Sequence, residues 1–352
     1  MVDTGILARG VSTALDTLED VVATAQRMLN GARDYAIAKG LTVSENGVVS
    51  IPPDAQVTDV TGMALALVEA QSMIDDAVDS AARADSACVA AIVACAVDPD
   101  SITTENARER QAVATRKAVE EIVGLLPYGQ PESGVQRWWA GLTPEQQIML
   151  KRAVPIELYD LPGIPSDVRN SLSENGRGYD PLATVRWARD NVNNADIDVF
   201  GNNCTNFVSR SLNEGGLKER RSGWGTTLER DNWGRSLAGD LGVPFVEGVT
   251  HTKSWYNADA QREFFLENGG VQIAVSDAQP GDVLYFNYAQ PNESGDFSHH
   301  TALVTGILPD GQVLYAQHTP GAADYSLQDR LPMVEQSEGQ QSVTIVRPKE
   351  TW

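Results

Sequence analysis

The sequence predicts an α+β protein, in which an elongated all-α region precedes a domain that packs a cysteine-bearing helix on an antiparallel sheet. Apolar residues recur at helical spacing early in the chain and alternate as in strands after residue 279. All seven Trp and all seven Phe lie beyond residue 137. We therefore expect a helical domain with a small β-hairpin, a Trp- and Pro-rich junction and a C-terminal domain, at residues 1–134, 135–175 and 176–352.

The composition is that of a folded protein with an acidic surface. Of the 352 residues 42% are hydrophobic, and the formal net charge is −21. Binding to phosphate groups needs clustered Lys and Arg, so the charge argues against nucleic acid or anionic lipid as a main partner. No segment approaches the roughly 20 consecutive apolar residues of a membrane-spanning helix.

The first residues, "MVDTGILARG", lack the basic and apolar regions of a cleaved signal peptide. Export without such a signal, to the cell envelope or the medium, is one interpretation. A cytoplasmic location is the alternative.

The helical region contains a heptad seam of small residues. The seam includes Cys88 and Cys95, and we therefore interpret both cysteines as packing residues. It indicates close helix packing, within the chain or with a helical partner. Asn46-Gly47 predicts the turn of a hairpin, and a third helix is expected over residues 103–126.

The junction begins with Trp138 and Trp139, which we interpret as packing anchors. Thr143-Pro144-Glu145-Gln146 has the composition of a helix start. The later prolines, Pro155, Pro162 and Pro165, predict a strap on the surface instead of a long helix.

Cys204 is the candidate nucleophile. It follows Gly201-Asn202-Asn203 and precedes a short amphipathic run that ends at Gly215-Gly216. Asn202 or Asn203 can cap a helix here, which places Cys204 in its first turn. The N–H groups and the positive dipole end of a helix favour a thiolate over a thiol.

The candidate base and its orienting group come from the strands after residue 279. His300, Ala302 and Val304 are expected on one face of a strand, and His318 at the end of the next. Spacing alone leaves three alternatives open: a nucleophile with its base, a zinc site formed by Cys204 and the histidines, and a non-catalytic binding module.

The junction resembles one in many actinobacterial proteins, in which a helical segment leads into "WW-x-x-L-T/S-P-E-E/Q-Q" and a proline-bearing motif. Here the matching residues are Trp138-Trp139, Leu142 to Gln146 and Gly163-Ile164-Pro165. The helical segments of such proteins are similar to type VII secretion modules. The resemblance implies a secreted effector, with a helical partner or a secretion chaperone bound to the N-terminal region.

The C-terminal domain resembles the putative amidase domain of bacteria, which is similar to the NlpC/P60 and CHAP cysteine hydrolases with a papain-like fold. The motifs are "GNNCTNFVSRSLNEGG", "KSW", "QPGD", "HTALVTG" and "QHT". The resemblance implies a cysteine amidase or peptidase that needs no metal or cofactor and acts on a peptide or cell-wall amide.

Carried over by motif, Cys204 is the nucleophile, His300 the base and His318 the orienting residue. Asn203 stands where the family usually has Asp, and His299 replaces a common Asp before the catalytic histidine. The Cys204 N–H, with Asn202 or Asn203, is expected to stabilise the oxyanion. Trp224 and Trp255 are candidates for a substrate groove, with packing as the alternative.

Overall fold

The computed structural model describes residues 2–96, 103–174, 176–221, 227–293 and 295–352. The chain divides into two compact units: Thr4–Pro165, and Ser166–Trp352 together with Met1–Asp3. The first is helical and the second contains an antiparallel sheet, so the predicted α+β class is confirmed. The division falls inside the predicted junction.

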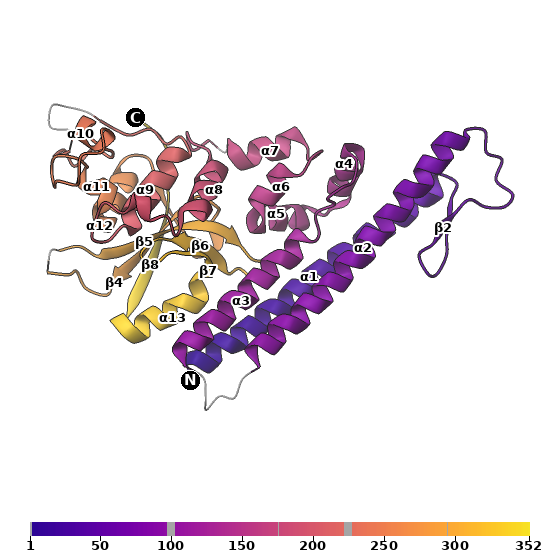
Figure 1. Cartoon of the computed structure of the whole chain (residues 1–352), viewed down its shortest axis with the longest axis horizontal. Coiled ribbons are helices and arrows are strands. Elements are labelled where there is room, and N and C mark those ends of the chain that lie inside the picture. The colour runs from indigo at the N-terminus through magenta and orange to yellow at the C-terminus, as the bar shows by residue number, and fades with distance from the viewer. Residues whose placement is uncertain (1, 97–102, 175, 222–226, 294) are drawn as a thin grey trace. The chain divides into compact units, whose positions relative to one another are not determined.

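Three long helices make up most of the first unit: α1 (Val2–Ala38), α2 (Val60–Cys95) and α3 (Thr104–Val123). They lie side by side, and small buried residues line their contacts (Figure 1). Cys88 and Cys95 are buried in this seam, as the sequence predicts. Helix α1 approaches so closely at Gly10 that a Cβ there would lie 2.9 Å from the sulfur of Cys95.

The predicted hairpin is also present. It pairs β1 (Thr42–Val43) with β2 (Val49–Ser50), and Gly47 takes the positive φ that its turn needs. No helix among the residues described is both long enough and apolar enough to cross a membrane.

The described residues of the junction form no long helix, as predicted, but they form short helices instead of the predicted surface strap. These are α4 (Glu132–Gly141), α5 (Pro144–Ala153), α6 (Pro155–Asp160) and α7 (Ser166–Ser173). Pro144 and Pro155 stand at the first position of α5 and α6, where a missing N–H costs nothing. Each proline therefore starts a short helix.

Two details of the junction match the prediction. Thr143 and Gln146 form the expected capping box, with hydrogen bonds of 3.3 and 3.0 Å between each side chain and the other's backbone N–H. Trp138 and Trp139 are both buried, as packing anchors should be.

The second unit is built on one six-stranded antiparallel sheet with the order β3-β8-β4-β5-β6-β7. Its strands are β3 (Val271–Ile273), β4 (Val283–Tyr288), β5 (Ser298–Ile307), β6 (Val313–Gln317), β7 (Ala322–Ser326) and β8 (Gln341–Arg347). The helices beside it are α8 (Pro181–Asn191), α9 (Cys204–Glu214), α10 (Leu237–Asp240), α11 (Lys253–Tyr256), α12 (Ala258–Glu267) and α13 (Leu327–Glu338).

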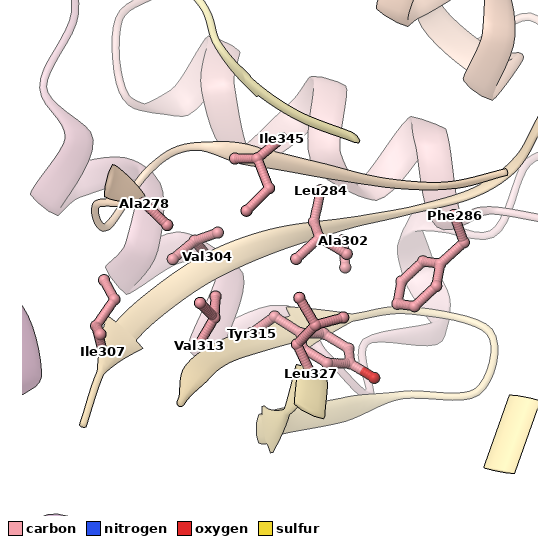
Figure 2. Packing of buried hydrophobic residues seen from close by; sticks show 10 residues of the cluster. All are labelled: Ala278, Leu284, Phe286, Ala302, Val304, Ile307, Val313, Tyr315, Leu327 and Ile345. Atoms are coloured by element: carbon pink, nitrogen blue, oxygen red, sulfur yellow. The ribbon is translucent and has the colours of Figure 1, made fainter. Parts of the chain in front are cut away.

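Side chains alternate between the two faces of this sheet. One face carries Ala302, Val304 and Tyr315 and packs against Leu327 of α13 (Figure 2). On the other face lies His318, which stacks on Phe207 of α9. Alternate residues of β5 and β6 therefore lie on opposite faces of the sheet.

Glu121 of α3 is a buried carboxylate without a hydrogen-bond partner in the described part of the chain. Its side chain is 4% exposed, and neither oxygen accepts a hydrogen bond there. Burial raises the pKa of Glu121 to about 8, and the charge of Lys117 only partly offsets it. Folded protein therefore holds this proton more tightly than unfolded protein does.

We predict that Glu121→Gln stabilises the chain at high pH and changes little in acid. The stability associated with this proton is complete below the unfolded pKa of about 4.3 and is lost as the pH rises through about 8. Gln keeps the shape without a charge, so the free energy of unfolding should rise by roughly 2–4 kcal/mol near pH 9. Denaturant titrations at about pH 4 and pH 9 measure this. An equal effect at both would contradict a buried charge.

Candidate active site

Cys204 is the first residue of α9, at the end of a turn that Asn203 holds in shape. The Asn203 side-chain oxygen accepts hydrogen bonds of 3.1 Å from the N–H groups of Val199 and Phe200, and its amide donates to the Phe200 carbonyl at 2.6 Å. Asn203 thus closes the turn, although it makes no side-chain cap bond to α9. Gly215 ends the helix as expected.

The Cys204 thiol is buried, and it interacts electrostatically with His300 of β5. Burial alone would raise its pKa. The interaction with His300 outweighs this, helped by the Thr301 backbone and the Thr205 hydroxyl, and the pKa of Cys204 is lowered to about 7. The lowered pKa increases the fraction of reactive thiolate near neutral pH.

Gln317, the last residue of β6, holds the opposite side of the His300 ring. His300 Nε2 lies 3.2 Å from Gln317 Oε1, and Gln317 Nε2 donates to the Pro320 carbonyl at 3.0 Å. The carbonyl of Pro320 can only accept, so it fixes the orientation of the Gln317 amide. His300 Nε2 then donates to Gln317, which makes Nδ1 the basic nitrogen of the neutral ring.

His318, which the family resemblance suggests as the orienting residue, has partners other than His300. His318 Nδ1 lies 2.8 Å from the Val192 carbonyl and Nε2 lies 2.7 Å from the Asp198 carboxylate. The ring stacks on Phe207 with a centroid distance of 5.7 Å. His318 lies on the α9 face of the sheet, where it ties the loop before α9 to the strands.

A signal for Gln317 was present in the sequence. Gln317 has the parity of Val313 and Tyr315, which share a sheet face with Ala302 and Val304. His318 has the opposite parity. The register between β5 and β6, which places Val304 opposite Tyr315, is needed to use this signal.

Asn202 covers the backbone of the candidate nucleophile. Its side-chain oxygen accepts a hydrogen bond of 3.2 Å from the N–H of Cys204. This is the N–H that was expected to stabilise an oxyanion, so a substrate carbonyl must first displace the Asn202 side chain. Asn203 is turned toward Val199 and Phe200 and does not offer its amide to a substrate.

One of the two candidate groove residues, Trp255, does not line a groove. Trp255 is fully buried, its ring is tilted against that of Trp233 with a centroid distance of 4.9 Å, and its indole N–H donates to Asn206 at 2.9 Å. It is therefore a core residue. Trp224 lies outside the described residues.

His299 has partners other than the thiol. Its Nε2 lies 2.6 Å from Gln341 Oε1, and its ring stacks on Tyr288 at 4.1 Å. The zinc alternative needs Cys204 and the histidines to converge, and His299 and His318 bind elsewhere. Within the described ranges, no group of three or more His, Cys, Asp or Glu side chains is arranged to hold a metal ion.

A pocket of about 240 Å³ opens beside His300. Asn202 and Gln317 line it, together with Thr319 after β6 and Arg330 of α13. A buried thiol with a depressed pKa, next to an anchored imidazole and an open pocket, is suited to nucleophilic attack on a carbonyl group.

Residues 178–345 match the family model described as "Putative amidase domain". The matched segment contains Cys204, His300 and Gln317. The match supports a C-terminal putative amidase domain, and this family suggests a hydrolase that acts on C–N bonds.

One curated relative also matches. The uncharacterized protein YhbB of Bacillus subtilis (strain 168) is 28% identical over 136 residues, which are 36% of this chain and 37% of YhbB. The chain thus spans little more than a third of this relative's length. No solved structure gives a significant match.

We predict that Gln317→Ala slows the reaction of Cys204 with iodoacetamide near neutral pH. Without the amide oxygen, His300 is free to turn away from the thiol, so less thiolate forms. The rate near pH 7 should fall about tenfold, while the rate at high pH, where any thiol ionises, stays close to that of wild type.

Gln317→Glu is a second variant that keeps an acceptor for His300 Nε2 but loses the donor to the Pro320 carbonyl, so it should retain more of the neutral-pH rate than Gln317→Ala. Equal rates for wild type and Gln317→Ala at every pH would show that Gln317 does not hold the imidazole.

Proposed function

We propose that the chain is a cysteine amidase or peptidase with a papain-like arrangement, in which Cys204 is the nucleophile and His300 the general base. The observation that carries the proposal is the buried Cys204 thiol at the start of α9, whose pKa is lowered to about 7 by His300 of β5. The amidase family match over the same residues supports an amide as substrate.

The first half of the reaction forms an acyl-enzyme. The Cys204 thiolate attacks the carbonyl carbon of the amide, a C–S bond forms and the carbonyl oxygen becomes an oxyanion. The Cys204 N–H receives this oxyanion once Asn202 has moved aside. Protonated His300 gives its Nδ1 proton to the amide nitrogen, the C–N bond breaks and the amine leaves.

The second half releases the acid. His300 takes a proton from water through Nδ1, and the resulting hydroxide attacks the thioester carbon. A C–O bond forms, the C–S bond breaks, and the thiolate is restored beside protonated His300. Gln317 keeps the ring oriented in both halves by accepting from Nε2.

The finer features are proposals as well. We propose that the amide belongs to a cell-wall peptide or an N-acyl amino acid, and that the protein is delivered as a type VII-like secreted effector. The resemblance of the junction and of the helical region to such effectors supports this.

We predict that Cys204→Ala abolishes amide hydrolysis. Purified peptidoglycan and a set of N-acetyl amino acids, incubated with wild type and variant, are analysed by mass spectrometry. We expect new amine and carboxylate ends with wild type only, and a rate loss of roughly 10³-fold or more in the variant.

Cys88→Ala is the matched control, because Cys88 is buried in the helical seam. It should retain full activity. Identical products from wild type and Cys204→Ala would contradict the proposal and favour a non-catalytic binding module.

A further inference from the structure

The pocket beside His300 has a cation on its α13 side. Arg330 lines it together with Val334, one helical turn later. The Arg330 guanidinium lies over the Tyr325 ring, 4.5 Å from its centroid, and Tyr325 meets Tyr315 edge-on at 6.3 Å. Stacking of this kind holds the flat guanidinium in a defined plane.

Arg330 lacks an anionic partner among the side chains that the structure describes. No described carboxylate forms an ion pair with it, and its Nε is shielded from solvent with no hydrogen-bond acceptor. Two other arginines of this unit are paired with a carboxylate: Arg177 and Arg347 both contact Asp282, at 3.0 and 2.8 Å. A partly buried guanidinium with unused donors can bind an acceptor from outside the chain.

The pocket beside His300 is lined by a positive charge, whereas the chain as a whole is strongly negative. The protein has 48 acidic and 27 basic residues, yet none of the described residues that line this pocket is acidic. Arg330, His299 and His300 all face it. A small cavity with one sign of charge concentrates ligands of the opposite sign.

We infer that Arg330 binds a carboxylate of the substrate, so that the enzyme selects amides of amino acids or peptides with a free carboxylate close to the scissile bond. The fork of a guanidinium matches the two oxygens of a carboxylate. A pocket of about 240 Å³ suits a group of amino-acid size. The inference rests on the proposed function, because it assigns the substrate class of the same site.

The test compares two reagents that alkylate Cys204 and differ in charge. Iodoacetate carries a carboxylate, whereas iodoacetamide has the same shape and is neutral. Rates at Cys204 are measured near neutral pH by mass spectrometry of tryptic peptides, for wild type, Arg330→Gln and Arg330→Lys. Arg230→Gln is the matched control, because Arg230 is 90% exposed, lies outside this pocket and undergoes the same change of charge.

We expect Arg330→Gln to lower the iodoacetate rate about tenfold and to leave the iodoacetamide rate within about twofold, as the loss of one charge-assisted contact predicts. Arg330→Lys should recover part of the difference, and Arg230→Gln should behave as wild type. An unchanged ratio of the two rates in Arg330→Gln would overturn the inference, as would an equal fall in both. If neither reagent modifies Cys204 in wild type, the proposed nucleophile itself is wrong and the inference falls with it.

Discussion

The candidate site depends on one histidine ring held from two sides. His300 meets the Cys204 thiol on one side and the Gln317 amide oxygen on the other. Burial opposes ionisation of the thiol, and the imidazole outweighs it. Without Gln317, the tautomer and the direction of the ring would not be fixed, and the start of α9 alone would have to stabilise the thiolate.

The rest of the domain keeps these three groups in register. His318 anchors the loop before α9 to the sheet, and Asn203 closes the turn from which Cys204 emerges. Neither residue touches the thiol. Both occupy positions that motif comparison links with catalysis, which explains why a sequence pattern alone does not separate chemistry from support. The Asn203 side chain holds the turn before α9 through neutral hydrogen bonds. The Asp that the family usually has at this position is therefore not needed to hold the turn.

Local signals were read correctly from the sequence. The heptad seam, the Asn46-Gly47 hairpin and the capping box at Thr143 all depend on residues close in the chain, and all are present. The positions of Cys204 at the start of a helix and of His300 on a strand were also predicted from residues close in the chain.

Features set by tertiary packing were missed. Gln317 and His318 are neighbours in sequence, and only the strand register decides which one faces His300. Trp255 is covered by elements far away in the chain, so its burial has no local signature. Helix α13, which carries Arg330, has a proline in its interior and was not predicted at all. Prolines also misled the interpretation of the junction, where they begin helices.

The most direct test of this account is a spectroscopic titration of the Cys204 thiolate. The ultraviolet thiolate absorbance is measured across the pH range for wild type and Cys204→Ala, and the difference reports the Cys204 thiolate. The same difference is then taken between His300→Ala and the double variant that carries both His300→Ala and Cys204→Ala. The account predicts a wild-type transition at a pKa of about 7 that moves upward when His300 is removed. A wild-type transition at the ordinary cysteine value of about 8.5, unchanged by loss of His300, would contradict it.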